Sequence, residues 1–582
     1  MSYFKDKLEP GVRSLPLIRS LYNYNSDDFR KDLVAGLTVG VILVPQGMAY
    51  ALLAGLPPVY GLYASLFPTA LYALFGSSRQ LSVGPVAMSS LLVLAGISAF
   101  AEPGSEKFIA LAITTALFVG LVQVAFGFFK LGFLVNFLSH PVIKGFTAAA
   151  ALIIAGSQLG HLLGLVLPQS NHVDVLLAST VQQLHLVHPY TFLLSVGAIA
   201  LIIILRAVHK SIPGALIAVA VGIAVVSFFS LAEQGVATVG AVPRGLPALQ
   251  MPQFSYADMR SLMSLAFLLT FVSMIESIAI AKAIEGRNKS YRLNPNQELI
   301  ALGLSKIFAS FFQAYPTTGS FSRSAVNSEA GARTGISSFV AAALVALTLI
   351  FLTPLFYALP KAVLAVIIVT AVSGLIDIST ARKLWRTHRS DFYMMLATFV
   401  ATLFLGIIQG VLAGVILSLV LMVYRSTKPH CTILGRIPGT NHYRNVSRFP
   451  QAEQPESTLI VRFDAPIFFG NANFFRETLE QFIDEKGDTL RNIIFDASSV
   501  YDIDSSGINM LEEIINTNKA SGIRFILAGA IGPLRDRLFR AELMDGIGYD
   551  NQFMDVYDAV MATQGNVRET GHALQTNIRG LI

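Results

Sequence analysis

Charged residues and cysteine are both scarce in this chain. Of its 582 residues 13% are charged and 53% are hydrophobic, whereas soluble domains carry about 25% charged residues. This balance indicates an integral membrane protein. Cys431 is the single cysteine, which excludes an internal disulfide and a cysteine-based metal cluster. The sequence also shows no nucleophile–base pair, phosphate loop or metal-ligand cluster, so we expect neither an enzyme nor a bound cofactor or metal.

The net charge of +6 does not indicate a nucleic-acid partner. The basic residues lie in short loops between apolar runs, where they set membrane topology. Residues 1–32 contain several Lys and Arg residues but no short apolar core followed by a cleavage site, so they do not resemble a signal peptide. We expect them to form a cytoplasmic N-terminal segment.

Apolar runs approaching the about 20 residues that cross a bilayer recur through residues 33–425. We count about fourteen, of which some are short or broken. If the N-terminus lies inside, the inner loops carry most of the Lys and Arg, which predicts an even number of spans with both termini cytoplasmic. The runs lie at 33–53, 57–75, 84–100, 107–129, 131–163, 190–207, 213–231, 260–284, 297–313, 318–332, 337–358, 361–377, 390–408 and 409–425.

Beyond residue 425 no apolar run is long enough to span a bilayer. We expect a linker and the start of a soluble domain at 426–457, the domain itself at 458–565, and a tail at 566–582. Strands are expected at 458–463, 490–496 and 524–529, and helices at 472–486, 508–520, 532–541 and 555–563. Alternating strands and helices predict a small cytoplasmic α/β domain.

The stretch 316–327 is polar, although apolar runs flank it on both sides. It contains Arg323, and an arginine at membrane depth costs several kcal/mol unless it faces a partner, water or an anion. Pro316 and Gly319 would end one helix and start another inside the bilayer. The first amide N–H groups of the new helix would then point into a cavity and favour an anion. The alternative is an ordinary re-entrant loop or cytoplasmic turn.

The two halves of the membrane region, 33–231 and 260–425, carry related features. The first span of the first half contains Gln46, and that of the second half contains Glu276. About 40 residues after each comes a broken segment rich in Gly and Ser, and paired broken helices in inverted repeats mark the binding site of many transporters. Seven spans per half is an odd number, so the halves would be inserted in opposite orientations.

Three motifs, in this order, resemble the sulfate permease (SulP) family, also called solute carrier 26. They are VPQGMAYALLAGLPPVYGLYASLFP (44–68), NQELIALGLSKIFASFFQAYPTTGSFSRSAVNSEAGART (296–334) and IIFDASSVYDIDSSGINML (493–511), of which the last is similar to a STAS domain. The resemblance implies an α-helical polytopic membrane protein of about 14 spans with a 7+7 inverted repeat, a core and a gate group of spans, a homodimer, and anion transport. One departure is Lys306, where the family is expected to have Asn. A lysine inside this apolar run should reach water, an interface or a carboxylate.

The candidate anion site lies where helices starting near Gly84 and Gly319 would face each other, each contributing roughly half a positive charge. With Arg323 the site carries about two positive charges, which suits a divalent anion or an incompletely neutralised monovalent one. Gln46 can donate from its side chain, and Tyr50 lies one turn away on the same face. A helix–helix hydrogen bond for Gln46 and plain packing for Tyr50 are the alternatives. The other candidate substrate ligands are backbone amides and hydroxyls of Val86, Ala87, Ser89, Ser320, Phe321 and Ser322.

Glu276 is the one carboxylate well inside an apolar run, and such a residue is a functional candidate. Burial favours its neutral form and a nearby Arg323 favours its charged form. Its protonation would therefore depend on the transport state, as proton coupling requires. The alternatives are a permanent ion pair with Arg323, Lys282 or Lys306, and a sodium site. Sodium would need more oxygen ligands, and Arg323 would repel it.

In the soluble domain the sequence Asp504-Ser505-Ser506-Gly507 comes just before a helix. The resemblance to anti-sigma-factor antagonists implies a phosphorylated serine here, and a phosphate at a helix N-terminus is favoured. Ser505 and Ser506 are therefore candidate regulatory sites, with a cytoplasmic partner for the domain. A simple capping turn is the alternative. Cys431 is expected to be inert.

These features predict secondary active transport, in the first place sulfate uptake by proton symport with elevator-like alternating access in a bacterial inner membrane. The alternatives are sodium- or proton-coupled uptake of bicarbonate or a dicarboxylate, an uncoupled chloride or anion channel, and a membrane sensor whose STAS domain is the working part. The expected partners are a small anion, a coupling proton, the lipid bilayer and a second copy of the chain.

Overall fold

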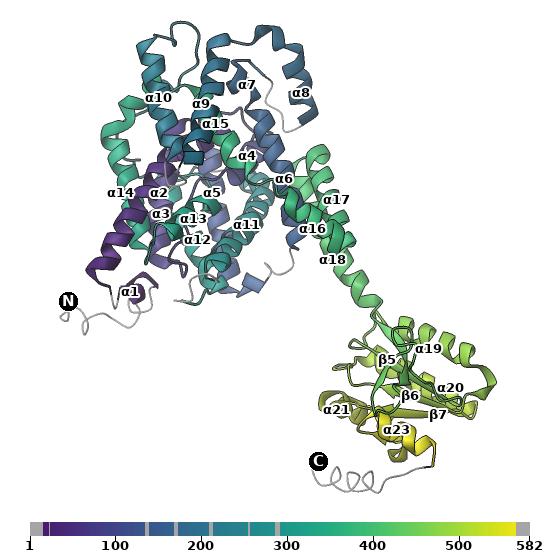
Figure 1. Cartoon of the computed structure of the whole chain (residues 1–582). Coiled ribbons are helices and arrows are strands. Elements are labelled where there is room, and N and C mark those ends of the chain that lie inside the picture. The colour runs from purple at the N-terminus through teal and green to yellow at the C-terminus, as the bar shows by residue number, and fades with distance from the viewer. Residues whose placement is uncertain are drawn as a thin grey trace, which may run out of the picture. The chain divides into compact units, whose positions relative to one another are not determined.

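The chain forms two compact units, Met1–Ser418 and Leu419–Ile582. A computed structural model describes residues 16–21, 24–133, 139–167, 173–208, 213–253, 256–285 and 291–565. The first unit is a bundle of helices, and the second contains a six-stranded sheet with helices (Figure 1). The predicted tail 566–582 and residues 1–15 of the predicted N-terminal segment lie outside the described residues.

Each predicted apolar run contains a helix. In both halves the third span is a short helix that follows a two-residue strand. In the described part of the chain, eight helices are long and apolar enough to cross a membrane by themselves. The first half contains α2 (Ser26–Leu53), α3 (Pro58–Phe75), α4 (Ala87–Ile97), α5 (Glu106–Phe128), α6 (His140–Ser157) followed by α7 (Leu159–Leu163), α9 (Pro189–Val208) and α10 (Gly214–Phe228). The second contains α11 (Tyr256–Glu285), α12 (Pro295–Ser310), α13 (Phe321–Glu329), α14 (Ile336–Leu347), α15 (Lys361–Ser373), α17 (Arg389–Leu405) and α18 (Ile407–Thr427).

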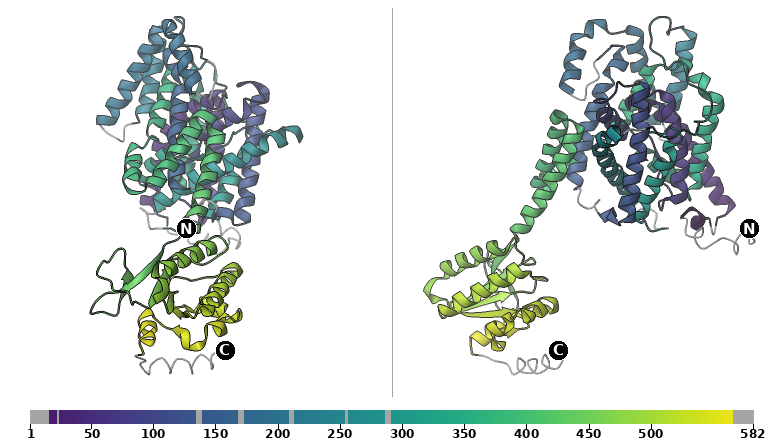
Figure 2. Two further views of the ribbon diagram at one scale, coloured as in Figure 1. Left: turned by 90° about the vertical axis from the view of Figure 1, so that its right-hand side faces the viewer. Right: turned by 180° about the vertical axis from the view of Figure 1, so that it is seen from behind.

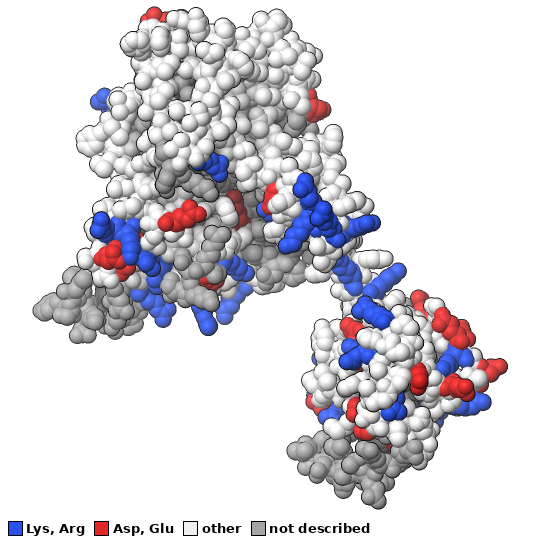
Figure 3. Space-filling model, viewed as in Figure 1, with Lys and Arg blue, Asp and Glu red and all other residues white. Residues whose placement is uncertain are grey.

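Further short elements lie outside the predicted runs or extend them. They are α1 (Pro16–Ser20), α8 (Val173–Gln182), η4 (Leu184–Leu186), η5 (Thr348–Leu352), η6 (Thr353–Ala358) and α16 (Ile378–Thr387). α16 carries several Lys and Arg residues and is too polar to cross a membrane. Figure 3 shows Lys and Arg side chains gathered toward one end of the helical unit, including over α16, and few charged atoms at the opposite end.

Helices α2–α5 and α11–α14 form one group, which we call the core group. In it α5 packs against α11 and α12, and α14 packs against α2 and α3. Small residues allow these close approaches. A Cβ at Gly120 of α5 would lie 2.7 Å from the carbonyl oxygen of Gly303 in α12, and Gly40 of α2 lies against Ala341 of α14. The core group therefore joins the first four spans of each half.

The remaining spans, α6, α7, α9, α10, α15, α17 and α18, form a second group, which we call the gate group. α6 packs against α17, and α15 and α10 pack against α9. Gly145 of α6 lies directly on the backbone of Met395 in α17, and Gly414 of α18 packs against Val142 and Thr398. The two groups meet mainly through α2 with α10 and α15, and through α4 with α6. Figure 2 shows the bundle from two further sides.

Two short strands join the halves of the bundle at its centre. β1 (Val83–Gly84) and β2 (Thr318–Gly319) pair in antiparallel register. Each leads into a short helix: at 1.5 Å per residue α4 and α13 are about 17 and 14 Å long, whereas the hydrocarbon core of a bilayer is about 30 Å thick. Both helices therefore begin inside the bundle, as the Gly- and Ser-rich breaks predicted.

The second unit is an α/β domain whose sheet has the strand order β4-β3-β5-β6-β7-β8. Strands β5 to β8 are parallel, and β3 is antiparallel to both β4 and β5. Apolar residues cover both faces of the sheet, with α19 and α20 on one face and α23 on the other. The strands are β3 (Cys431–Arg436), β4 (Tyr443–Asn445), β5 (Thr458–Phe463), β6 (Asn492–Asp496), β7 (Arg524–Ala528) and β8 (Gln552–Phe553). The helices are α19 (Ala472–Lys486), η7 (Gly487–Thr489), α20 (Ser505–Ala520), α21 (Gly532–Arg540), α22 (Leu543–Ile547), η8 (Tyr549–Asn551) and α23 (Val556–Thr563).

The polar segment 426–457 contributes more regular structure than its composition indicates. α18 continues to Thr427, and β3 and β4 form one side of the sheet. β4 lies at the edge, and polar residues suit an edge strand because only part of its surface is covered. The segment thus holds the first strands of the soluble domain.

Candidate anion-binding site

The β1–β2 pair holds the starts of α4 and α13 side by side. Val83 of β1 pairs with Gly319 of β2, and the backbone N–H of Ser320 donates to the carbonyl oxygen of Ser82 at 2.9 Å. The two broken segments predicted from the sequence therefore meet, one from each half of the chain. The first N–H groups of a helix have no acceptor inside the helix, so two partial positive charges are brought together here.

The two helix starts differ in exposure. At α4, Val86 occupies the N-cap position in extended conformation, and it is buried together with Ala87 and Ser89. The Ser89 hydroxyl donates back to the Val86 carbonyl at 3.3 Å. At α13, Ser320 is the N-cap and its Oγ accepts from the backbone N–H of Arg323 at 3.5 Å. The next two residues, Phe321 and Ser322, are exposed, so the site opens on the side of α13.

Arg323 is the cation of this site, and it has no exposed surface. Its Nη1 donates to Oε1 of Gln46 at 3.2 Å and its Nε donates to Oγ of Ser82 at 3.4 Å. Its Nη2 is buried and finds no hydrogen-bond partner among the described residues. The side-chain oxygen of Gln46 therefore accepts a helix–helix hydrogen bond from Arg323. The amide N–H₂ group of Gln46 remains as a possible donor to a ligand. The guanidinium keeps one donor group for a ligand.

Two tyrosines lie within electrostatic range of the Arg323 guanidinium. Tyr50, predicted from the spacing along α2, is buried with 5% of its surface exposed. Tyr315, which the sequence analysis did not select, is also buried, and its hydroxyl lies 3.1 Å from Oγ of Ser90 in α4. Tyr315 comes directly before Pro316 and the polar stretch 316–327. A side-chain hydroxyl at this position, next to the helix break, is the feature that could have identified the residue.

Glu276 lies in α11, and its carboxylate also interacts electrostatically with Arg323. Its Oε2 is buried and has no hydrogen-bond partner in the described part of the protein. No ion pair joins Glu276 to a basic residue within that same part; Lys282 is exposed and Lys306 has other partners. The structure therefore does not show the permanent ion pair considered above.

Other buried carboxylates are fully engaged by the fold. Asp32, at the start of α2, accepts from the backbone N–H and Oγ of Thr334 at 3.1 and 2.6 Å. Glu298, at the start of α12, accepts from the backbone N–H and Oγ of Ser77, both at 2.7 Å. Both carboxylates anchor loops at helix ends. Glu276 differs because it lies within α11, away from the helix ends, and one of its oxygens has no partner among the residues that the structure describes.

Lys306, where the family resemblance implied Asn, is buried at the interface of α12, α5 and α11. Its Nζ donates to Oε1 of Gln123 at 2.8 Å, to the Leu302 carbonyl at 3.3 Å and to Oγ of Ser273 at 3.4 Å. The carbonyl of Ser273 in turn accepts from Oγ1 of Thr318 in β2 at 3.3 Å. The ammonium group of Lys306 is therefore held by neutral oxygen acceptors between the helices. It lies next to the candidate anion site but is not part of it.

The two helix-break glycines face different neighbours. A Cβ at Gly84 would lie 3.2 Å from Nη2 of Arg323, so this glycine borders the guanidinium. A Cβ at Gly319 would lie 2.9 Å from Leu81 and 3.1 Å from Oγ of Ser277 in α11. Gly84 therefore makes room for the cation, whereas Gly319 lets β2 pack on α11.

In the second unit the Asp504–Gly507 sequence forms the capping turn of α20. Oδ1 of Asp504 accepts from the backbone N–H of Gly507 at 2.9 Å. Ser505 and Ser506 are exposed in the first turn of the helix, where a phosphate would meet the helix N-terminus. Regulation by phosphorylation stays a prediction.

Comparison with known proteins identifies the family. Residues 29–398 match the sulfate permease family, and residues 449–559 match the STAS domain. The chain belongs to the sulfate permease family. This permease is 41% identical over 549 residues to probable sulfate transporter 4.2 of Arabidopsis thaliana, covering 91% of this chain and 80% of the relative. It is 36% identical over 547 residues to a probable sulfate transporter of Mycobacterium tuberculosis, covering 94% and 97%.

Solved structures agree with the fold of the permease. The murine Solute Carrier 26 family member A9 anion transporter, in its inward-facing state, superimposes with a TM-score of 0.87 at 26% identity, over 97% of both chains. The transmembrane domain of the cyanobacterium bicarbonate transporter BicA gives a TM-score of 0.59 at 24% identity, over 68% of this chain and 98% of that one. The predicted family and fold class, a helical polytopic membrane protein with a C-terminal STAS domain, are therefore confirmed.

Proposed function

We propose that this permease transports sulfate across the membrane together with protons, and that it holds the anion between the starts of α4 and α13. The observation that carries the proposal is the Arg323 guanidinium, which is fully buried beside both helix starts with Nη2 unpaired in the described residues. Two helix starts and one arginine give about two positive charges, which match a divalent anion. Relatives named as sulfate transporters match 91% and 94% of the chain.

The place of the proposed site in the fold supports an elevator-like movement. Strands β1 and β2 and helices α2, α4, α11 and α13 all belong to the core group, so the proposed site can move as one body with that group. The gate group supplies none of the residues proposed to bind the anion. Alternating access by movement of the core group against the gate group is thus the simplest mechanism.

Glu276 is the group proposed to carry the coupling proton. When it is charged, it competes with the anion for Arg323; when it is neutral, the guanidinium is left to the anion. Proton and anion therefore support each other's binding, which is the requirement for symport. A sodium ion at the same place would be repelled by Arg323.

The charge distribution supports a topology with both termini in the cytoplasm. Lys and Arg side chains gather toward one end of the helical unit (Figure 3), and cytoplasmic loops are enriched in these residues. We assign residues 33–425 to transport and 458–565 to a cytoplasmic STAS domain, in a homodimer in a bacterial inner membrane. The STAS domain is proposed to bind a cytoplasmic partner.

Uptake by the full-length protein in proteoliposomes tests this function. Labelled sulfate should accumulate under an inward proton gradient without sodium and saturate with concentration. Bicarbonate, chloride and succinate, each added in excess, should compete less well than unlabelled sulfate. Strict dependence on sodium would replace the proton as the coupling ion, and large unitary currents without saturation would identify a channel instead.

A further inference from the structure

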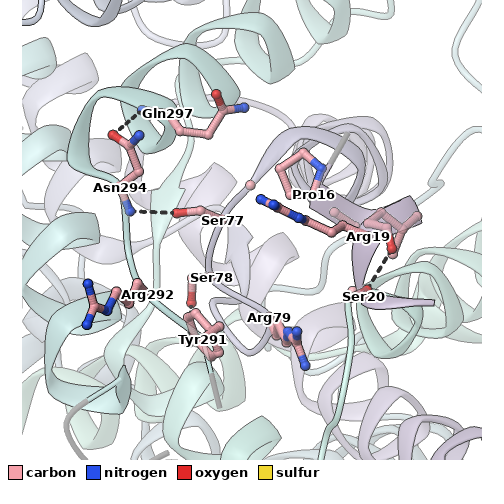
Figure 4. A pocket seen from close by; sticks show the side chains of 14 residues that line it. Pro16, Arg19, Ser20, Ser77, Ser78, Arg79, Tyr291, Arg292, Asn294 and Gln297 are labelled. Carbon is pink, nitrogen blue, oxygen red and sulfur yellow. Dashed lines mark hydrogen bonds between the residues drawn. The ribbon is translucent and has the colours of Figure 1, made fainter. Parts of the chain in front are cut away.

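A cavity of about 500 Å³ lies in the helical unit between α1, the end of α3 and the start of α12 (Figure 4). None of the residues assigned to the anion site lines it. The lining residues are Pro16, Leu17, Arg19, Ser20, Ala73, Gly76, Ser77, Ser78, Arg79, Tyr291, Arg292, Asn294, Gln297 and Gly335. This second cavity has no role in the transport mechanism described above.

Three arginines from three separate segments line the cavity, and none of its 14 lining residues is acidic. Figure 4 shows Arg292 on one side of Ser77 and Ser78, and Arg19 and Arg79 on the other. Within the described residues none of the three forms an ion pair with a carboxylate. The guanidinium of Arg79 is held over the ring of Tyr291, 5.5 Å from its centroid. Arg19 and Arg292 are exposed and Arg79 is half-buried, so these positive charges favour an anion at this opening of the bundle.

Two carboxylates lie near the lining, and they do not cancel the three positive charges: Glu285, whose Oε1 accepts from the backbone N–H of Leu293 at 2.8 Å, and Glu298. Glu298 has no exposed surface, and its oxygens accept hydrogen bonds from Tyr72, Ser77 and Ser78. The two carboxylates together offset at most two of the three charges. The start of α12 is not free for a ligand either, because Oδ1 of Asn294 already caps it. Recognition in this cavity would therefore fall to the guanidinium groups.

The size and lining of the cavity define the class of ligand. Arginine presents a planar fork of donors that matches phosphate oxygens in pairs. A volume of about 500 Å³ lies in the range of pockets for small organic molecules, about 300–1,000 Å³, and exceeds what one inorganic anion fills. Leu17 and Ala73 add apolar surface for an organic group. We propose that this cavity binds a phosphate ester, either an anionic lipid headgroup or a soluble metabolite, independently of the transport function.

Thermal unfolding and ligand titration of the full-length protein in detergent test the proposal. The probes are inorganic phosphate, glycerol 3-phosphate and short-chain phosphatidylglycerol, with short-chain phosphatidylcholine as the uncharged-headgroup control. Glycerol 3-phosphate or phosphatidylglycerol should raise the unfolding midpoint. Arg79→Gln and Arg292→Gln should each weaken that binding about tenfold or more, whereas Arg382→Gln, at an exposed position of α16, is the matched control and should not.

The outcomes separate this site from the transport site. Sulfate binding should be unchanged in Arg79→Gln and Arg292→Gln, and phosphate-ester binding should be unchanged in Arg323→Gln. Binding of phosphatidylglycerol alone identifies a lipid as the source, and binding of glycerol 3-phosphate alone identifies a metabolite. The proposal is overturned if no probe raises the midpoint, if inorganic phosphate binds as well as both esters, or if the variant with all three arginines changed to Gln keeps full affinity.

Discussion

Buried charges in this protein fall into two kinds, and the difference separates structural from functional residues. Asp32 and Glu298 are buried with several hydrogen bonds each. Arg323 and Glu276 are buried, interact electrostatically, and each keep an atom without a partner in the described residues. An unpaired buried charge costs stability, and we propose that a ligand or a proton completes these two groups during transport.

Arg323→Gln tests the role of the guanidinium. Loss of a charged hydrogen bond to the anion should cost about 1.5–3 kcal/mol, which weakens sulfate binding about 10- to 150-fold. Titration calorimetry on the purified protein measures the change. Lys282→Gln removes an exposed positive charge from α11 and serves as the control. Unchanged sulfate affinity in a folded Arg323→Gln protein would move the anion site elsewhere.

Lys306 should act on stability rather than on sulfate binding. Lys306→Met leaves Oε1 of Gln123 unpaired beside an Nε2 that already lacks a partner in the described residues, so it should destabilise the fold by about 1–3 kcal/mol. Replacing both partners by apolar residues is close to neutral, so Gln123→Leu in the same chain should recover most of the loss. Thermal unfolding of the single and double variants measures this; a double variant less stable than Lys306→Met would refute the pairing.

Cys431 in β3 should react slowly with thiol reagents. Burial, followed by the nearby Asp464 carboxylate, raises the pKa of the Cys431 thiol to about 12. Only the thiolate reacts, so at pH 8 maleimide labelling of the folded protein should be at least about 100-fold slower than that of free cysteine. Because the folded pKa lies above the unfolded one, this group stabilises the fold below about pH 9 and loses that effect as the pH rises toward 12. Labelling in urea is the control, and equally fast labelling of the folded protein would contradict the burial.

At the scale of elements, hydrophobic runs predicted the helices and strands well. Every predicted span contains a helix, and the strand at 458–463 and the helix at 472–486 have the same bounds in the structure. The amphipathic helix α16 and the strand β4 escaped prediction because their polar composition resembles that of loops, and β3 escaped because it is short and lies in a polar, turn-rich segment. The junction of β1 and β2 followed from the repeated breaks in the two halves.

The side-chain geometry of the site could not be read from the sequence. The contact of Arg323 with Gln46 and Ser82, and the proximity of Tyr315, depend on how α2, α4 and α13 cross. The same holds for Gly84 and Gly319, whose equivalent positions in the two strands face the guanidinium and α11, respectively. The residue types limited the chemistry, whereas helix packing decided which atoms meet.

The two strand glycines should respond differently to substitution. In Gly84→Ala the new Cβ would lie 3.2 Å from Nη2 of Arg323, so sulfate binding should weaken with little change in stability. In Gly319→Ala it would lie 2.9 Å from Leu81 and 3.3 Å from the backbone of Ser277, so the fold should lose about 1–3 kcal/mol. Thermal unfolding with and without sulfate separates the effects. Gly197→Ala, which meets no atom within 4 Å, is the control; equal stability losses at Gly84 and Gly319 would contradict the assignment.

At the scale of the whole molecule, each half of the chain contributes one helix start and polar side chains to the proposed site. α2 and α4 supply Gln46 and one helix start, and α11 and α13 supply Glu276, Arg323 and the other. All of them lie in the core group. In the proposed mechanism the anion and proton sites therefore lie in the same moving body, so that one movement would carry both.

The central claim is that Glu276 couples sulfate transport to protons. Glu276→Gln imitates the protonated carboxyl, so this variant should bind and exchange sulfate but should not accumulate it under a proton gradient. The decisive measurement compares wild type and Glu276→Gln in proteoliposomes, first as exchange of labelled for unlabelled sulfate and then as uptake driven by an inward proton gradient. We expect near-normal exchange and loss of gradient-driven accumulation in the variant. Gradient-driven accumulation at the wild-type level in Glu276→Gln would remove Glu276 from the coupling mechanism.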